Sequence, residues 1–279
     1  MKRIINDQSI IIEERMNNIV KISKTIAADE TVSDMSLSAE DKNERFLKYI
    51  NELGLRSIGH VDSEGNLVST DGFSNDVSEK EYFKNAMKGT EFYISNPSFV
   101  KGTDEQIIYT MVPIKNGSEV KGAITCTFDS SFLSEQIKNL KYYNGTGKSY
   151  IISNKGVVIA SDDLDNVKNQ RNLIEESQDN SSLKEANEIY NSMIAGDTGI
   201  KKFNDGTEKY VVYAPIEGTN GLSIALEIES SIVDKDSQRI MKIFIGVAVI
   251  GIVMLVVFGW LFGESIGKRL IKLKDSLSI

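Results

Sequence analysis

Apolar residues recur at helical spacing along the first 53 residues of the chain. Isoleucines spaced seven residues apart, with one methionine among them, predict a long helix over residues 4–28 that carries an apolar stripe (Ile5, Ile12, Met16, Ile19, Ile26). Such a stripe fits packing of the helix on its own domain and, equally, a seam between two copies of the chain, and both can hold along one helix. A second helix is expected over residues 39–53, with Ser38 and Asp41 as a capping pair.

After Gly54 the pattern changes to short apolar runs separated by turn residues. The stretch RSIGHVDSEGNLVSTDG (56–72) predicts a strand, a turn and a second strand. The stretch VSEKEYFKNAMKG (77–89) predicts a short helix that ends at Gly89. The runs EFYIS, QIIYTMVPI and VKGAITCTF then predict three further strands.

The same pattern recurs in the second half of the chain. HVDSEGNLVSTD (60–71) aligns with IISNKGVVIASD (151–162), which places Gly65 on Gly156, and AITCTFDSSFL (123–133) aligns with SIALEIESSIV (223–233). The offset grows from 91 residues to 100, so we expect an insertion in the second copy around residues 163–195. The duplication predicts an α+β fold with two modules, each an antiparallel sheet with helices on one side.

Residues 243–262 form one uncharged apolar run, IFIGVAVIGIVMLVVFGWLF. At about 1.5 Å of rise per residue, these twenty residues span roughly 30 Å, the thickness of the hydrocarbon core of a bilayer. Basic residues cluster directly after the run (Lys268, Arg269, Lys272, Lys274). The positive-inside rule therefore predicts a cytoplasmic C-terminus and an extracytoplasmic N-terminal body.

Composition narrows the classes of function. The chain has one cysteine and one histidine, which argues against an intrachain disulfide, a His-based catalytic triad and a zinc site. Residues 1–242 hold 28 basic and 38 acidic residues, and such an acidic body argues against nucleic acid as a partner. We expect no cofactor and no catalytic residues. No apolar signal segment follows MKRII, so we expect a first membrane helix upstream and an output domain downstream.

With these motifs in order, residues 5–233 resemble the double Cache (dCache) sensor domains of bacterial transmembrane receptors, most of all those of methyl-accepting chemotaxis proteins. The motifs that carry the resemblance are the long first helix, VSEKEYFKNAMKG, VPIKNGSEVKGAITCTFD, YNGTGKSYIISNKGVVIAS and KYVVYAPIEGTNGLSIALEI. The resemblance implies two tandem PAS-like modules after a long N-terminal helix, followed by one transmembrane helix. The corresponding segments are 1–53, 54–138, 139–233, 234–263 and 264–279.

The last segment, SIGKRLIKLKDSL, resembles the start of a HAMP linker, with Arg269 where that linker usually has proline. Apolar residues spaced 4, 3 and 4 apart (Ile266, Leu270, Leu273, Leu277) predict a seam of a parallel coiled coil. A short amphipathic helix lying on the lipid headgroups is the alternative.

The dCache resemblance implies a ligand pocket in the first, membrane-distal module, near Lys80, Tyr82, Phe83, Tyr109 and Thr127. Aromatic side chains with one cation suit a small molecule that carries a carboxylate. Asp129 lies on the same side of its strand as Thr127 and is a further candidate. Relatives that bind amino acids usually have arginine in place of Lys80 and aspartate in place of Thr127, which argues against an amino-acid ligand and leaves a carboxylate or another small metabolite open.

Competing interpretations apply to single residues. Tyr82 and Phe83 also fit the core face of a helix, and Lys80 fits a solvated surface position. A hard cation could bind Asp162, Asp163 and Asp165, although solvated loop carboxylates are the more common finding, and we predict no metal site. His60 and Cys126 fit structural positions on apolar strands.

We therefore predict the sensor region of a homodimeric transmembrane chemoreceptor that detects a small molecule outside the cell and drives chemotaxis. The alternatives are the sensor region of a histidine kinase or of a cyclic-dinucleotide enzyme, with the output domain beyond Ile279. A membrane-anchored adhesion or scaffold module without a small ligand is the alternative from another class, and an occluded first-module pocket would favour it. A membrane-anchored extracytoplasmic hydrolase is less compatible with the scarcity of histidine and cysteine.

Overall fold

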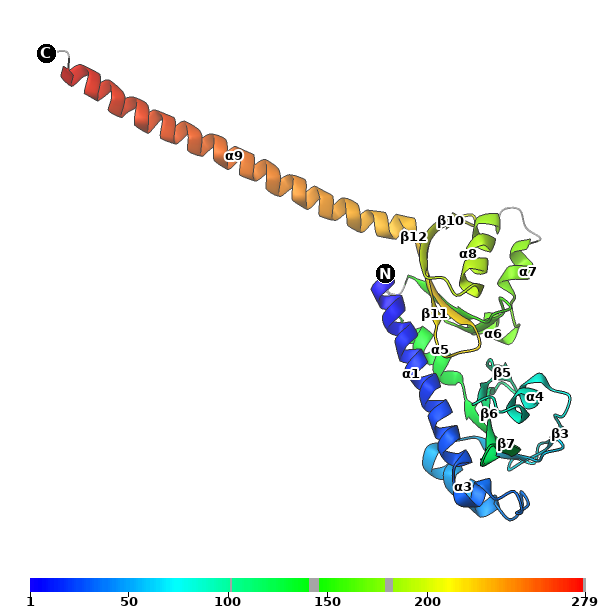
Figure 1. Cartoon of the computed structure of the whole chain (residues 1–279). Helices are drawn as coiled ribbons and strands as arrows, with labels where there is room; N and C mark the ends of the chain where they lie inside the picture. The colour runs from blue at the N-terminus through cyan, green and yellow to red at the C-terminus, as the bar shows by residue number, and fades with distance from the viewer. Residues whose placement is uncertain (101, 141–145, 179–182, 278–279) are drawn as a thin grey trace. The chain divides into compact units, whose positions relative to one another are not determined.

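A computed structural model describes residues 1–100, 102–140, 146–178 and 183–277. The chain forms two compact units, Met1–Glu229 and Ser230–Ile279. The first unit contains a long helix and two antiparallel sheets, and the second is one helix (Figure 1). The α+β architecture expected from the alternation of apolar runs is therefore confirmed. The finer domain boundaries stay predictions.

The long first helix, α1 (Lys2–Ala27), packs against both sheets of the first unit (Figure 1). The apolar stripe of this helix, with its isoleucines seven residues apart, is buried, and Ile5, Ile12 and Ile26 are fully excluded from solvent. Packing of the stripe on its own domain is thereby confirmed. Because the stripe is buried against the sheets of its own chain, a dimer formed through α1 would use other residues of the helix.

Two short helices follow α1, and one carboxylate joins them. Asp29 caps α2 (Glu30–Ser33) through the backbone N–H groups of Thr31 and Val32, and it also accepts hydrogen bonds from Arg45 and Tyr49 on α3 (Asn43–Leu53). Burial by itself would raise the pKa of Asp29, but the hydrogen bonds from these partners outweigh burial and lower the pKa to about 2.

The predicted second helix begins later than residue 39. Ser38 and Asp41 form the expected reciprocal pair, since the Ser38 hydroxyl donates to the Asp41 carboxylate at 2.7 Å and the Asp41 N–H donates to the Ser38 hydroxyl at 3.2 Å. This pair closes a turn that precedes the helix, so α3 starts at Asn43. The helix ends as expected at Leu53, and its C-cap residue Gly54 adopts φ +68°.

The first sheet has seven strands in the order β3-β2-β1-β7-β6-β4, with β5 also paired to β6. All of its pairings are antiparallel. The strands are β1 (Ser57–Val61), β2 (Asn66–Ser69), β3 (Ser74–Asp76), β4 (Tyr93–Ile94), β5 (Ser98–Phe99), β6 (Gln106–Asn116) and β7 (Glu119–Asp129), and α4 (Glu81–Met87) lies between β3 and β4 in the chain. We call this sheet with α4 the first module.

The second sheet has five strands in the order β10-β11-β12-β8-β9. The strands are β8 (Lys148–Ile152), β9 (Val158–Ser161), β10 (Gly199–Asn204), β11 (Glu208–Ile216) and β12 (Leu222–Glu229). The helices are α5 (Ser131–Asn139), which links the two sheets in the chain, and α6 (Leu164–Lys168), α7 (Leu173–Gln178) and α8 (Lys184–Ile194). We call this sheet with α6, α7 and α8 the second module.

The two sheets show the duplication that the sequence predicts. The order β2-β1-β7-β6 in the first sheet matches β9-β8-β12-β11 in the second. Gly65 and Gly156 occupy equivalent hairpin turns with φ +93° and +78°, a conformation that favours glycine. The predicted insertion corresponds to α6, α7 and α8, where the first module has only α4.

Alternation along the strands gives the first sheet two different faces. Ile58, Thr110 and Cys126 point to the α1 side, where the Thr110 hydroxyl donates to the Ser23 hydroxyl of α1 at 2.7 Å. Their neighbours Tyr109 and Thr127 pair across β6 and β7 and point to the opposite side. This second face carries the candidate site.

A buried hydrogen bond joins the two modules within the first unit. The Gln106 amide at the start of β6 donates to the Ile159 carbonyl of β9 at 2.7 Å. An exposed ion pair, Lys168 with Asp104 at 2.8 Å, joins the same two regions.

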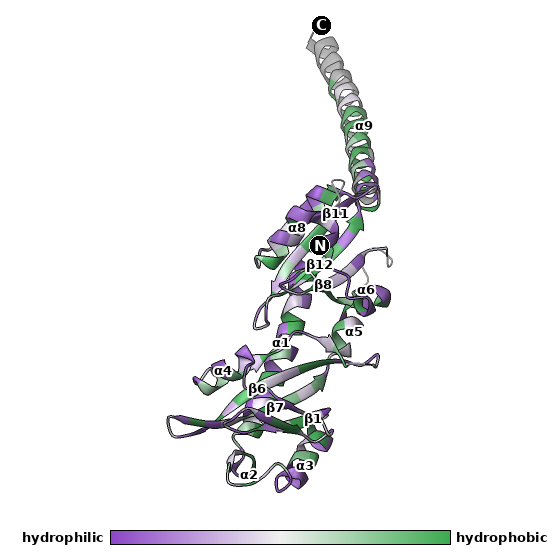
Figure 2. Cartoon of the chain, turned by 90° about the vertical axis from the view of Figure 1, so that its right-hand side faces the viewer, coloured by the Kyte–Doolittle hydropathy of each residue, from purple (hydrophilic) through white to green (hydrophobic). Residues whose placement is uncertain are grey.

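The second unit is the helix α9 (Ser230–Leu277), which starts directly after β12 and runs without a break. In the described part of the chain it is the one helix long and apolar enough to cross a membrane, over Ser230–Gly263. Figure 2 shows the hydrophobic residues of this stretch. The side chains of Leu270, Leu273 and Leu277, which form most of the predicted coiled-coil seam, lie outside the described residues.

Candidate functional site

A cavity of about 630 Å³ lies in the first module on the sheet face opposite α1. Its floor is formed by alternate residues of β1, β6 and β7, and its walls by the loop after β2, by β3 and by α4. The volume is in the range of sites that bind small molecules. The lining residues are Arg56, Ser57, Leu67, Ser69, Asp71, Gly72, Phe73, Asn75, Val77, Tyr82, Val100, Ile107, Tyr109, Met111, Thr125 and Thr127.

Three tyrosines cluster at one wall of the cavity. The Tyr82 ring stacks on Tyr93 with centroids 5.2 Å apart, and it meets the Tyr109 ring edge-on at 5.8 Å. Burial raises the pKa of Tyr82 and of Tyr109, so both phenols stay protonated and can donate a hydrogen bond. The wall therefore offers apolar ring surface with polar tips.

Charge at the cavity comes from Arg56 and Asp71. The Arg56 guanidinium lies 3.6 Å from the Asp71 carboxylate and 2.8 Å from the carboxylate of the exposed Glu105. A guanidinium can bind a carboxylate through two parallel hydrogen bonds. Because Glu105 lies in solvent, an anionic ligand can replace it on Arg56 at a small cost.

The structure brings together three of the six predicted site residues. Tyr82, Tyr109 and Thr127 line the cavity, from α4, β6 and β7 respectively. Tyr109 and Thr127 are directly paired across two strands, which fixes their side chains on one face.

The other three predicted residues lie outside the lining, so a role in ligand contact stays a prediction for them. Lys80 is the exposed N-cap residue of α4. Phe83 is buried in the apolar cluster beneath that helix. The Asp129 carboxylate accepts the Ser131 N–H at 2.6 Å at the end of β7.

Sequence reasoning missed several polar residues of the cavity, above all Arg56, Ser57 and Asp71. Ser57 could have been predicted by pairing the strand at 57–61 with the strand that carries Thr127, because β1 pairs with β7 and places Ser57 opposite Thr127. Arg56 and Asp71 flank the β1–β2 hairpin, and no local pattern distinguishes them from other charged residues at strand ends.

His60 and Cys126, the two other residues singled out from the sequence, are buried among residues of the fold. His60 is buried with its Nε2 atom 3.3 Å from the Met35 sulfur, and burial together with the nearby Lys42 cation lowers the His60 pKa to about 4. Burial raises the pKa of the Cys126 thiol to about 12, so it stays protonated. Across the residues with described side chains, no cluster of three or more His, Cys, Asp or Glu residues could hold a metal ion.

The family model for the Cache domain matches residues 1–236, which is most of the chain. The chain belongs to the Cache domain family. No curated protein matches it significantly.

Several solved structures of sensor domains share this fold at low sequence identity. One is the extracellular domain of a histidine kinase, at 14% identity and a TM-score of 0.68, covering 83% of this chain and 96% of that one. A second is the ligand-binding domain of an amino-acid chemoreceptor of Pseudomonas aeruginosa in complex with GABA (16% identity, TM-score 0.62, 81% and 97% coverage). A third is the sensory domain of a Campylobacter jejuni chemoreceptor with isoleucine bound (11%, 0.60, 84% and 92%).

Proposed function

We propose that this Cache protein is the extracytoplasmic sensor of a transmembrane chemoreceptor and binds a small molecule in the first-module cavity. The observation that carries the proposal is the 630 Å³ cavity on the sheet face opposite α1, lined by Tyr82, Tyr109 and Thr127. An open cavity of this size suits a small ligand better than an adhesion or scaffold role, for which no cavity is needed.

The ligand class that fits best is a small molecule with an apolar body and one carboxylate. Arg56 is the cation at the cavity and would bind the carboxylate in place of Glu105. The tyrosine rings of the wall would cover the apolar body, and the Thr127 hydroxyl would hydrogen-bond a polar group at the floor. The structural relatives with GABA and isoleucine bound support a ligand of this size.

The basic residues after the apolar run support a cytoplasmic C-terminus, with both modules on the extracytoplasmic side. The first module is then the membrane-distal one, because the second module continues directly into α9 at Ser230. A ligand that favours one of two sensor conformations shifts the equilibrium between them, and the continuous helix transmits the change to the cytoplasmic side. The sensor acts as a homodimer and has no catalytic activity of its own.

The test is a thermal-shift screen of the full chain in detergent against organic acids, amino acids, amines and purines, followed by calorimetry or circular dichroism. A ligand present at a hundred times its Kd stabilises the folded state by about 2.7 kcal/mol. The proposal requires a saturable shift that Arg56→Ala and Thr127→Val remove, whereas Lys121→Ala, a charge change outside the cavity, leaves it intact. If the shift given by a carboxylate ligand is unaffected by both cavity variants, the assignment is wrong.

The second candidate is the sensor region of a histidine kinase. The extracellular domain of a histidine kinase shares this fold with a TM-score of 0.68. The two candidates differ in the output domain that would follow α9, and the ligand cavity serves either one.

A further inference from the structure

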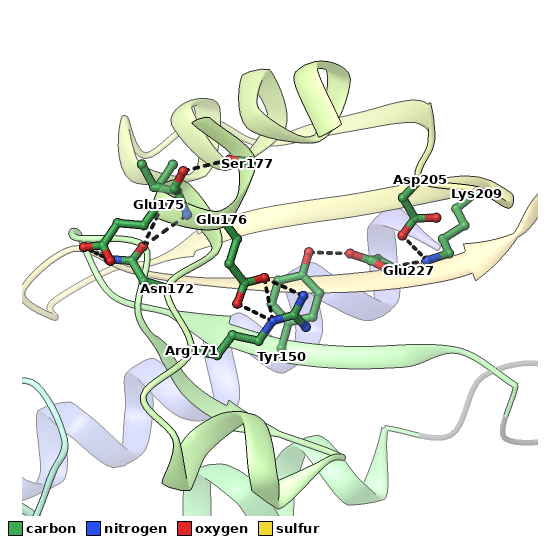
Figure 3. Close-up of polar contacts among 10 residues, drawn as sticks. Tyr150, Arg171, Asn172, Glu175, Glu176, Ser177, Asp205, Lys209 and Glu227 are labelled. Atoms are coloured by element: carbon green, nitrogen blue, oxygen red, sulfur yellow. Dashed lines mark hydrogen bonds and ion pairs between the residues drawn. The ribbon is translucent and has the colours of Figure 1, made fainter. Parts of the chain in front are cut away.

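The second module holds a cavity of its own, of about 400 Å³, lined by polar side chains of β8, β11, β12 and α8. Figure 3 shows three of them, Tyr150, Lys209 and Glu227, with their polar contacts. Its central residue is Glu227 on β12, whose side chain is only 11% exposed. The Tyr150 hydroxyl donates to one Glu227 oxygen at 2.7 Å. The other oxygen has the Lys209 ammonium at 3.7 Å, beyond hydrogen-bonding distance.

Glu227 occupies the place in the second module that Thr127 occupies in the first. Thr127 pairs with Tyr109 and Ser57 on the neighbouring strands, and Glu227 pairs with Val211 and Lys148 on the equivalent strands. Both residues therefore stand on the sheet face that carries a cavity. The duplication has placed a carboxylate where the first module has a hydroxyl.

The charge of Glu227 is incompletely neutralised. The Lys209 ammonium is closer to Asp205, at 2.6 Å, than to Glu227, at 3.7 Å. Burial raises the pKa of Glu227, which reflects the cost of holding this carboxylate away from water. A cation bound in the cavity would lower that cost.

Two other cations line the cavity: Lys148, which pairs with Glu227 across β8 and β12, and Arg171, which is engaged by a neighbouring carboxylate. The Arg171 guanidinium donates to both oxygens of Glu176 at 2.9 and 2.8 Å (Figure 3). Four carboxylates and three cationic side chains line the cavity, and Glu176 on Arg171 adds another negative charge beside it. The cavity is therefore net acidic, which disfavours an anionic ligand.

Two tyrosines supply the surface that an organic cation prefers. Tyr150 and Tyr190 both line the cavity, and Tyr150 is almost fully buried. Aromatic rings attract an ammonium group through their negative faces. We propose that this cavity is a second binding site, specific for a small organic ammonium ion, with Glu227 as its counter-ion and Tyr150 and Tyr190 as its aromatic wall. The site is independent of the ligand proposed for the first module.

The experiment is calorimetric titration of the full chain in phosphatidylcholine nanodiscs with butylamine, putrescine and choline, and with butyrate as the anion of matched size. At least one of the three cations should bind with one site per chain, and butyrate should not compete for that site. Glu227→Gln keeps the size of the side chain and its acceptor for Tyr150, and it should weaken cation binding at least tenfold. Glu188→Gln, the same charge change at an exposed position of α8, should alter affinity less than twofold.

If Glu227→Gln fails to fold by circular dichroism, Tyr190→Leu tests the same site. Tyr190→Leu removes one aromatic ring and should weaken cation binding three- to tenfold. Thr127→Val in the first module should leave cation binding unchanged, so the two proposed sites can fail separately. No binding by any of the three cations, binding indifferent to Glu227→Gln in a folded variant, or tighter binding of butyrate at this site would overturn the proposal.

Discussion

The buried contact between the two modules offers a sharp test of how the sensor unit is held together. Gln106→Ala removes the amide that donates to the Ile159 carbonyl at 2.7 Å, so this buried carbonyl loses that donor. A buried polar group left without its partner costs about 1–3 kcal/mol. For a unit of this size, a loss of about 2 kcal/mol lowers Tm by roughly 4–8 °C.

Two further variants separate the hydrogen bond from other effects. Gln106→Glu preserves the size of the side chain but replaces the donor by an acceptor that faces the Ile159 carbonyl, so it should destabilise at least as much as Gln106→Ala. Asp104→Asn breaks the ion pair with Lys168. Because the Asp104 side chain is 80% exposed and the Lys168 side chain 46% exposed, this change should alter the free energy of unfolding by less than about 0.5 kcal/mol.

Differential scanning calorimetry of the three variants measures these losses directly. We expect a large shift of Tm for both Gln106 variants and almost none for Asp104→Asn. Equal shifts for Gln106→Ala and Asp104→Asn would refute it, because they would show that the buried amide contributes no more than an exposed ion pair.

Three other predictions concern pH, turn geometry and helix phase. Asp29→Asn should lower the free energy of unfolding by about 1–2 kcal/mol at pH 7, after allowance for solvent screening. Because the pKa of Asp29 in the folded protein is about 2, urea titrations should show this difference shrinking as the pH falls from about 4 to 2. A difference that is independent of pH would contradict the role of the ion pair with Arg45. Gly65→Ala should lower the free energy of unfolding, measured by chemical denaturation, clearly more than Gly72→Ala does. Both glycines have positive φ, but only at Gly65 would an added Cβ meet the backbone, at 2.6 Å from the Ser78 nitrogen. Equal losses would argue against this close approach. Inserting one residue after Lys235 rotates the following helix by about 100° and should disturb signalling in a hybrid receptor with a known output domain. Seven inserted residues nearly restore the rotational position of the helix and should disturb signalling less. Signalling that is unaffected by the single insertion would rule out coupling through α9.

Local patterns were sufficient to predict most elements of this fold. Most strands, such as β1, β6 and β7, follow from short apolar runs, and the candidate membrane helix follows from twenty uncharged residues. The polar edge strand β3 (Ser74–Asp76) has no such run and was not predicted. The duplicated alignment of Gly65 with Gly156 also predicted equivalent turns, because both positions need positive φ. These features depend on neighbours along the chain, which the sequence displays directly.

The candidate site was only partly predictable because it depends on contacts between strands. Tyr109 and Thr127 share one face through their pairing, and alternation along β6 and β7 was enough to place them there. Tyr82 and Phe83 are adjacent on α4, and only packing decides that Tyr82 lines the cavity while Phe83 enters the core. Arg56 lies just before β1, where its meeting with Asp71 depends on the tertiary fold.

Hydrogen–deuterium exchange of the full chain, with and without a saturating carboxylate hit from the ligand screen, tests the central claim most directly. The ligand should slow exchange in α4 (Glu81–Met87) and β3 (Ser74–Asp76), which form walls of the first-module cavity, and Arg56→Ala should abolish this protection. Unchanged exchange in the first module, or protection confined to the second module, would contradict the proposal that the first-module cavity is where this Cache protein senses its ligand.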